Sequence, residues 1–179
     1  MPILRQRPVA GLFLECILML FLFQRVLLRL VLGGALFLAL PAQAFCFNEA
    51  GARYKVDPLL LRSMATVESS LNPRAVGMNR DKKGHVTSRD FGLMQINDRH
   101  IPQLRALGLI TSEQDLLNNT CLNVQIGAWI LAKHLKQCGV NWQCLGSYNA
   151  GFADNNGPRR MIYARKIYAM YMKLKGGAA

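Results

Sequence analysis

The sequence predicts a mainly helical domain with one small β-hairpin, and three observations support this prediction. Two long stretches, 122–137 and 159–175, repeat apolar residues at helical spacing. A shorter apolar stretch begins after the pair Asp57-Pro58, which combines a helix cap with a proline suited to a first turn. The segment 77–90 between these stretches is polar and rich in turn residues, which is typical of a hairpin.

The first 44 residues are predicted to be a secretory signal. Two apolar runs follow basic residues and end in Pro-Ala-Gln-Ala at Ala44, which resembles a signal cleavage site. A secretory signal needs only one apolar run, and translation from Met19 would leave a single apolar run of ordinary length. A transmembrane anchor is the alternative, but Arg25 and Arg29 interrupt the ~20 apolar residues that a span requires. We therefore expect cleavage after Ala44 and export.

Cleavage would leave residues 45–179, enough for one domain with a single core. Loss of four arginines and Glu15 changes the formal net charge from +12 to +9. A basic exported domain implies an anionic partner such as an envelope polymer or a membrane surface, with solubility alone as the alternative explanation. Nucleic acid is disfavoured as a partner because of export and because the basic residues are scattered along the chain.

The predicted domain keeps four cysteines, and an even number after a secretory signal indicates two disulfides. Three pairings are possible. We favour Cys138–Cys144, which closes a short loop, together with Cys46–Cys121, which ties the start of the domain to its middle. A zinc site is the alternative, but no Cys-x-x-Cys motif occurs and His134 is badly spaced for one. We expect no metal and no organic cofactor.

The predicted elements follow one another with recognisable ends. Helices are predicted for 45–54 and 58–70, and Asn72-Pro73 is expected to end the second because a residue before proline disfavours helical dihedrals. The hairpin is expected to turn at Lys83-Gly84. The sequence TSEQ, which begins at residue 111, resembles a capping box that opens a short helix. The apolar stripe of the next helix, which ends at a glycine, is Leu122, Ile126, Trp129, Ile130 and Leu135. The stripe of the last helix, which closes with two lysines, is Tyr163, Ile167, Met170, Tyr171 and Leu174.

Glu68 is the strongest candidate for chemistry on physical grounds. Most of the helix that carries it is expected to be buried, and it follows Met64 and Ala65 on the inward side by three or four residues. Removal of water from a carboxyl disfavours its charged form, which raises its pKa and suits it to donate a proton. The alternative is an ordinary glutamate on a solvated or salt-bridged rim.

Three blocks of the chain resemble the signature motifs of the lytic transglycosylase (SLT) family. They are ESSLNP at 68–73, GLMQIN at 92–97 and SYNAG at 147–151, and their order and approximate spacing match. The resemblance covers nearly the whole predicted domain and implies a lysozyme-like α+β fold. It also implies cleavage of the MurNAc–GlcNAc bond of peptidoglycan in the periplasm. The Cys46-Phe47 start and the small size resemble members that accompany type III secretion, conjugation and pilus machines.

The resemblance also implies a mechanism. Glu68 would protonate the leaving glycosidic oxygen and then act as the base. In this family the second group is usually the 2-acetamido oxygen of the substrate, and attack by the C6 hydroxyl yields a 1,6-anhydro sugar. Ser69 would orient or contact the acid, although it could simply help to end its helix.

Five further residues are implied to contact the substrate or the acid. Met94 would line the cleft, and Gln95 would hydrogen-bond sugar substituents. Tyr148 and Asn149 would meet the sugars near the cleavage point, and Tyr163 matches a tyrosine that faces the acid. Core packing is the alternative for Met94, Tyr148 and Tyr163, and helix capping is the alternative for Gln95.

Asp90 departs from the pattern of most relatives. The run DFGLMQIN at 90–97 resembles a run of animal-type lysozymes, in which an ionised Asp works beside a buried acid. Asp90 would then stabilise the transition state or make the enzyme a hydrolase. Its alternative is a turn residue that pairs with Arg89 or Lys82.

The sequence therefore predicts a monomeric, exported peptidoglycan lytic transglycosylase that opens the cell wall locally for a secretion, pilus or conjugation apparatus. The first alternative is a lysozyme-type muramidase that uses Glu68 and Asp90. The second is a non-catalytic glycan-binding component of a secretion system. Glu68 together with Gln95 and the pair Tyr148-Asn149 disfavours this second alternative.

Overall fold

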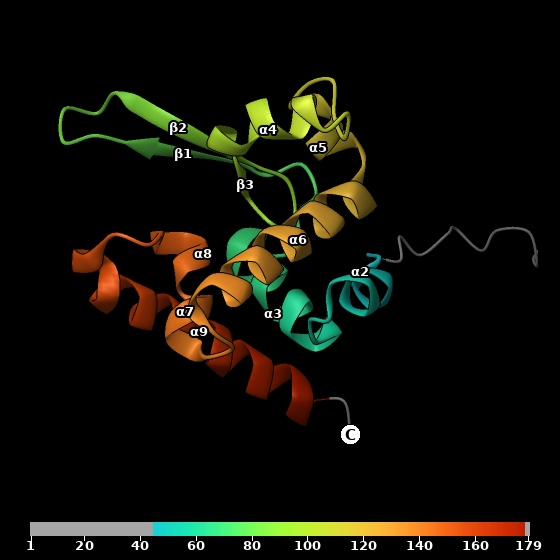
Figure 1. Cartoon of the computed structure of the whole chain (residues 1–179), viewed down its shortest axis with the longest axis vertical. Coiled ribbons are helices and arrows are strands. Elements are labelled where there is room, and N and C mark those ends of the chain that lie inside the picture. Colours follow the sequence, from blue (N-terminus) through green and yellow to red (C-terminus); the bar gives the residue numbers. More distant parts are fainter. Residues whose placement is uncertain (1–44, 178–179) are drawn as a thin grey trace, which may run out of the picture. The chain divides into compact units, whose positions relative to one another are not determined.

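A computed structural model of the chain describes residues 45–177 (Figure 1). The predicted signal segment, its cleavage site and the alternative start at Met19 lie outside this range. No helix in the described range is long and apolar enough to cross a membrane. The elements in chain order are α2 (Phe47–Tyr54), α3 (Pro58–Ser69), β1 (Val76–Arg80), β2 (Val86–Phe91), β3 (Ile96–Asn97), η2 (Asp98–His100), α4 (Ile101–Ala106), α5 (Gln114–Asn118), α6 (Thr120–Cys138), α7 (Trp142–Leu145), α8 (Ser147–Ala150), η3 (Asp154–Asn156) and α9 (Gly157–Gly176).

The core lies where α3 packs against α2 and α9, and where α6 packs against α2, α5, α7 and α8. Leu61 and Met64 of α3 are fully buried there, as are Val124 and Leu131 of α6 and Ile167 of α9. The three-stranded sheet contacts this helical body through β3 and α6. The mainly helical prediction with one hairpin is therefore confirmed.

The start of α3 agrees with its sequence signals. Pro58 occupies the first turn, and the Asp57 carboxylate accepts a hydrogen bond from the backbone N–H of Leu59 at 2.8 Å. The same carboxylate accepts a 2.6 Å hydrogen bond from the Tyr171 hydroxyl on α9. One cap residue thus orients α3 and ties it to the last helix.

The end of α3 differs from the predicted one. Two consecutive residues, Ser70 and Leu71, adopt left-handed backbone angles with φ of 54° and 61°. The N–H of Leu71 reaches back to the carbonyl of Ala65 at 3.3 Å, which closes the helix before Pro73 can act. Glu68 consequently lies in the last turn of α3, where the chain leaves the core.

The hairpin formed by β1 and β2 extends away from the helices (Figure 1). β1 pairs antiparallel with β2, and β3 pairs antiparallel with the other edge of β2. The register places Gly77 of β1 and Asn97 of β3 on either side of Asp90. Asp90 therefore lies on the central strand of the sheet.

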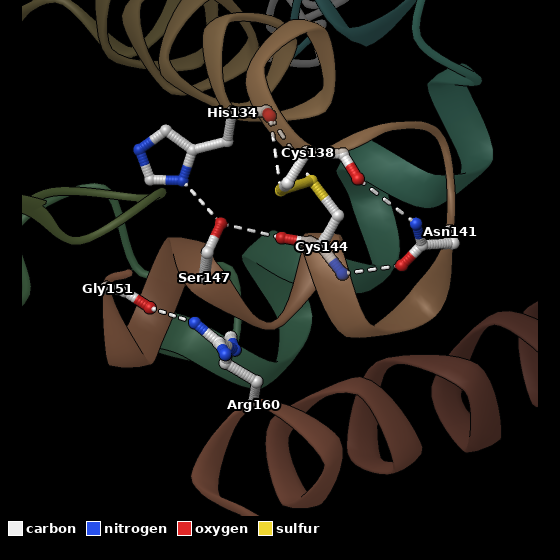
Figure 2. The surroundings of a disulfide bond; sticks show 7 residues. All are labelled: His134, Cys138, Asn141, Cys144, Ser147, Gly151 and Arg160. Atoms are coloured by element: carbon white, nitrogen blue, oxygen red, sulfur yellow. Dashed lines mark hydrogen bonds between the residues drawn. A yellow bond between two sulfur atoms is a disulfide. The ribbon is translucent and has the colours of Figure 1, made fainter. Parts of the chain in front are cut away.

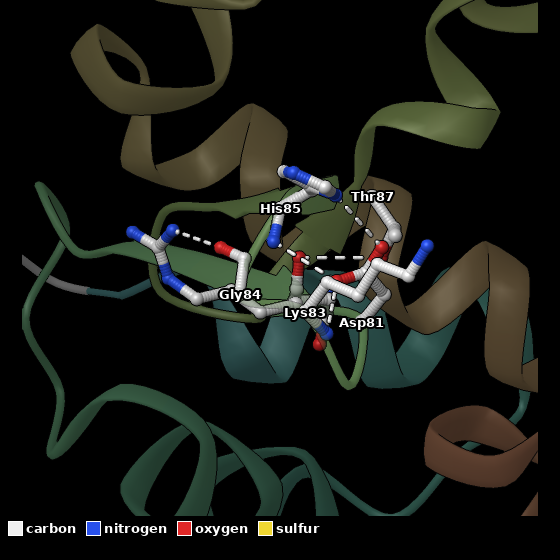
Figure 3. A network of polar contacts seen from close by, with 7 residues as sticks. Asp81, Lys83, Gly84, His85 and Thr87 are labelled. Carbon is white, nitrogen blue, oxygen red and sulfur yellow. Dashed lines mark hydrogen bonds and ion pairs between the residues drawn. The ribbon is translucent and has the colours of Figure 1, made fainter.

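The hairpin tip is organised by Asp81 (Figure 3). Its carboxylate accepts the backbone N–H groups of Lys83 at 2.8 Å and His85 at 2.9 Å, and these hydrogen bonds lower the pKa of Asp81. Gly84 has a φ of +86°, which a side chain would disfavour. The predicted turn at Lys83-Gly84 is confirmed.

The predicted capping box is wrong. α5 begins at Gln114, and its N-cap residue Glu113 makes no side-chain hydrogen bond. The carboxylate of Asp115 takes this role, since it accepts the backbone N–H of Thr111 at 2.7 Å and that of Ser112 at 3.2 Å. The motif predicts this contact from the side chain of Gln114, one residue earlier, whereas the short helix that it predicts does form.

Both favoured disulfides are confirmed. Cys46 and Cys121 join the start of the described domain to α6, with 5.2 Å between their Cα atoms. Cys138 and Cys144 join the end of α6 to α7, with 5.6 Å between their Cα atoms (Figure 2). The first closes a loop of 75 residues in sequence separation and the second a loop of 6. Loop length makes the first bond the larger constraint on the unfolded chain.

Candidate active site

Glu68 is held at the end of α3 by a tyrosine from the last helix. The hydroxyl of Tyr163, whose side chain is only 5% exposed, donates a 2.6 Å hydrogen bond to Glu68 Oε1. Burial and, to a smaller extent, the charge of Asp90 raise the pKa of Glu68 to about 7, against the lowering effect of this hydrogen bond. Burial and the charge of Glu68 raise the pKa of Tyr163 well above 10, so Tyr163 remains a neutral donor.

Asp90 is held in a different way, by uncharged amides from both neighbouring strands. Asn97 Nδ2 of β3 donates to Asp90 Oδ1 at 2.7 Å, and Asn79 Nδ2 of β1 donates to Oδ2 at 2.7 Å. The hydroxyl oxygen of Ser88 accepts from the same two amides at 3.2 and 3.0 Å. The alternative in which Asp90 pairs with Arg89 or Lys82 is wrong, since Asp90 forms no ion pair with either of them in the described structure.

Gln95 forms the tight turn between β2 and β3. Its backbone is left-handed with a φ of 47°. Its side-chain Nε2 donates to the carbonyl oxygens of Gly92 at 2.8 Å and Ala75 at 3.3 Å. The amide nitrogen of Gln95 is therefore engaged with the backbone, so the predicted hydrogen bonds to sugar substituents would fall to Oε1, which lies against Gly77.

Asn123 is a site-supporting residue to which the sequence assigned no role. Its buried amide nitrogen donates to the carbonyl oxygens of Phe91 at 2.9 Å and Leu116 at 3.1 Å. Its Oδ1 accepts the N–H of Met94 at 2.8 Å. It thereby fastens the turn after Asp90 to α6. The sequence contains one indication of this supporting role. Asn123 precedes Ile126 by about one helical turn and therefore lies on the apolar face of α6.

Met94 and Ser69 have structural roles in the site. Met94 is fully buried, and a Cβ on Gly127 would lie 2.8 Å from its side chain, so Met94 packs in the core and does not line an open cleft. The hydroxyl of Ser69 contacts the carbonyl oxygens of Leu93 at 2.8 Å and Ala65 at 3.1 Å. Ser69 therefore links α3 to the turn and supports the position of the acid through the backbone.

Tyr148 lies close to both acids. Its hydroxyl donates to the carbonyl oxygen of Met94 at 2.9 Å. Burial raises the pKa of Tyr148 well above 10, and the charges of Glu68 and Asp90 raise it further. Asn149, the next residue of α8, is exposed. Tyr148 thus stabilises the turn, whereas Asn149 is free to meet a ligand.

A histidine network positions the helix that carries Tyr148 (Figure 2). The hydroxyl of Ser147 donates to the carbonyl oxygen of Cys144 at 2.6 Å, and its oxygen lies 2.8 Å from His134 Nδ1. Because Ser147 has one proton to donate, Nδ1 of His134 carries the proton of this second hydrogen bond. The pKa of His134 is lowered, first by burial and then by nearby positive charge. The His134 ring lies 4.7 Å from that of Phe152.

Two cavities lie away from these residues. One of about 520 Å³ is bordered by residues of α2 and the start of α3, and one of about 230 Å³ is bordered by residues of α7 and α9. Neither is lined by Glu68 or Asp90. Within residues 45–177, no three His, Cys, Asp or Glu side chains are grouped to hold a metal ion. The candidate site holds two carboxyl groups, Glu68 and Asp90, in unlike surroundings.

Comparison with known proteins agrees with this geometry. The family model for the transglycosylase SLT domain matches residues 45–171. Among curated proteins, the peptidoglycan-binding-like protein of Escherichia coli O157:H7 is 53% identical over 133 residues, which are 74% of this chain and 80% of that protein. The invasion protein IagB of Salmonella typhimurium is 40% identical over 138 residues, 77% of this chain and 82% of that protein. Protein IpgF of Shigella flexneri is 36% identical over 132 residues, 74% and 82% of the two chains.

The fold has a counterpart among solved structures. An inactive mutant of the lytic transglycosylase Slt from Pseudomonas aeruginosa superposes with a TM-score of 0.54 at 18% identity, over 75% of this chain and 24% of that one. This likeness confirms the predicted lysozyme-like fold. With the match of the family model over most of the described domain, the chain belongs to the transglycosylase SLT domain family, whose enzymes are peptidoglycan lytic transglycosylases.

Proposed function

We propose that Glu68 is the acid and base of a reaction that cleaves the MurNAc–GlcNAc bond and leaves 1,6-anhydro-MurNAc ends. The observation that carries this proposal is the position of Glu68 in the last turn of α3, where it is largely withdrawn from water and held by the Tyr163 hydroxyl. This burial raises its pKa to about 7, so that the group can both give and take a proton at neutral pH. The bond from Tyr163 occupies Oε1, so the transferable proton is on Oε2.

The reaction begins with transfer of the Oε2 proton to the glycosidic oxygen, and the bond from that oxygen to the anomeric carbon breaks. The 2-acetamido oxygen of the substrate bonds to the anomeric carbon as the leaving sugar departs. The Glu68 carboxylate then takes the proton of the C6 hydroxyl, whose oxygen displaces the acetamido group. The new C1–O6 bond completes the anhydro ring, Glu68 is again protonated, and no water is consumed.

Asp90 supports a second candidate, a muramidase that adds water. Its carboxylate is oriented by Asn79 and Asn97, and its charge is felt at Glu68. An oriented carboxylate near a protonated acid is the arrangement of a retaining glycosidase, in which the carboxylate attacks or stabilises the anomeric carbon. We assign Asp90 the stabilising role, because the acetamido group of the substrate can supply the nucleophile.

We further propose that the mature protein is residues 45–179, a periplasmic monomer that opens the wall locally for a secretion, conjugation or pilus apparatus. The similarity to a protein named for invasion supports this context.

The sugar ends released from purified sacculi test this proposal. The full chain, exported and purified from the periplasm, is incubated with sacculi, and the products are analysed by mass spectrometry. Anhydro-muramic ends, absent from the digest with Glu68→Gln, are the expected result. Reducing muramic ends would make the enzyme a hydrolase. The absence of cleavage, with both disulfides intact, would favour a glycan-binding protein.

A further inference from the structure

An apolar patch on α7 and α9 lies outside the site formed by Glu68 and Asp90. Large apolar side chains line it although each is more than a third exposed, Trp142 at 40% and Tyr168 at 49% among them. We call this surface the α7–α9 patch, and its residues are Trp142, Met161, Arg165, Tyr168 and Met172, the last of which follows Tyr168 by about one helical turn. Contiguous apolar surface of this kind marks an interaction site.

The patch is a second face of α9, separate from the core face. Tyr163, Ala164 and Ile167 point inward and are buried. Met161 and Tyr168, seven residues apart, share another side of the helix and are exposed, and the buried Ala164 lies at the border between the two sides, where it also lines the cavity. Substitutions on the outer side can therefore change binding while Tyr163 keeps its contact with Glu68.

A cavity of about 230 Å³ lies within the patch, and its walls are almost entirely apolar. Trp142 of α7 meets Tyr168 of α9 edge to face, with ring centroids 5.2 Å apart. Met161 and Arg165 border the cavity beside them. A concave site with Trp, Tyr, Met and Arg walls has the composition of protein–protein hot spots, and its volume suits one large apolar side chain.

The charge around the patch has one sign. α9 carries six Lys and Arg residues and no Asp or Glu. None of these six forms an ion pair with another residue of the described range. Arg165 is one of the residues that border the cavity. An occupant with carboxylates next to its apolar anchor would complement this charge.

We propose that the α7–α9 patch binds an acidic amphipathic segment of a partner protein, one apolar side chain of which fills the cavity while a neighbouring carboxylate pairs with Arg165. The concave, side-chain-sized cavity favours a protein over a lipid surface, which would contact a convex apolar face. This inference is independent of the proposed reaction, because the patch residues lie outside the catalytic site.

A displayed library of random 12-residue peptides tests the proposal on the full chain purified from the periplasm. We expect enriched peptides to carry Asp or Glu within one helical turn of Leu, Phe or Trp. Met161→Asp, which places a charge at the cavity, and Arg165→Glu should each weaken binding at least tenfold. The matched control is Leu107→Asp, an equally drastic change at an apolar residue that is 55% exposed outside the patch. Replacing the peptide carboxylate by Lys should restore binding to Arg165→Glu.

Five results would overturn the proposal. Enriched peptides without carboxylates would contradict the predicted chemistry, and so would binding that Met161→Asp leaves unchanged. Failure to enrich any peptide would also reject it, as would patch-dependent binding to phosphatidylglycerol vesicles or patch-dependent dimerisation in sedimentation. Cleavage of sacculi by the same variants separates this test from that of the reaction, because Met161→Asp and Arg165→Glu should retain it.

Discussion

The two carboxyl groups of the site have opposite surroundings. Glu68 lies at the end of an apolar helix, where one tyrosine hydroxyl is its hydrogen-bond partner. Asp90 lies on the central strand of a small sheet, where amides from both neighbouring strands satisfy its two oxygens. Burial, compensated by only one donor, raises the pKa of Glu68 to about 7, and the charge of Asp90 contributes to the same shift.

This comparison shows how one small fold prepares an acid. The helical body removes water from Glu68, and the sheet holds a negative charge close by without an ion pair that would cancel it. Because the two effects come from different elements, they can be changed separately by mutation.

The largest effect is expected for Glu68→Gln, which removes the proton donor and keeps the shape of the side chain. Loss of a general acid costs about 10²- to 10⁴-fold in rate, so the release of sugar ends should fall by roughly 10³-fold. Near-normal release by this variant would remove Glu68 from the mechanism.

Glu68→Gln also tests the effect of burial on Glu68 through the stability of the protein. The folded protein holds the Glu68 proton up to about pH 7, whereas the unfolded chain loses it near the ordinary value of 4.5. The unfolding free energy of the wild type should therefore fall as pH rises from 4.5 to 7, by at most about 3 kcal/mol. Denaturant unfolding at pH 4 and pH 8 should show Glu68→Gln more stable than the wild type only at the higher pH.

Asn123→Leu should break the link between α6 and the turn that follows Asp90. It leaves the carbonyl oxygens of Phe91 and Leu116 and the N–H of Met94 buried without partners. Each such group costs about 1–3 kcal/mol, so the unfolding free energy should fall by roughly 3 kcal/mol or more. The control, Asn118→Leu at an exposed position of α5, should change it little in the same denaturant titration.

Asp90→Asn should reduce cleavage by roughly tenfold, since it removes one stabilising charge and leaves the acid in place. The loss of that charge should also lower the pKa of Glu68, so the alkaline limb of the rate profile should move to lower pH. A loss as large as that of Glu68→Gln, with reducing ends in the products, would instead make Asp90 the nucleophile of a hydrolase.

Tyr163→Phe should give the smallest change in the cleavage rate. It should shift the pH–rate profile in the direction opposite to that of Asp90→Asn. The hydrogen bond from Tyr163 lowers the pKa of Glu68, so its removal should raise that pKa and extend activity to higher pH. We expect a rate loss of a few-fold, on the order of one hydrogen bond. If Asp90→Asn and Tyr163→Phe shifted the pH–rate profile in the same direction, the electrostatic account of Glu68 and Asp90 would be refuted.

The sequence predicted the parts of the site that depend on local pattern. Helical spacing placed Glu68 on the buried side of its helix, and loop length favoured the disulfide pairing that the structure has. It did not predict the contacts of Asn79, Asn97 and Asn123, because these depend on strand register and on packing between distant segments. Met94 and Gln95 belong to a recognisable motif, yet whether such side chains face a ligand or the core is decided by tertiary packing.

Direct titration of Glu68 is the most decisive measurement. Residues 45–179 contain three glutamates, Glu49, Glu68 and Glu113, so labelling with ¹³C-glutamate gives few carboxyl resonances, and the one missing in Glu68→Gln is that of Glu68. The account predicts a midpoint near pH 7 for this resonance. A midpoint near 4.5 would show that Glu68 is an ordinary ionised carboxylate at neutral pH and would contradict its role as the acid.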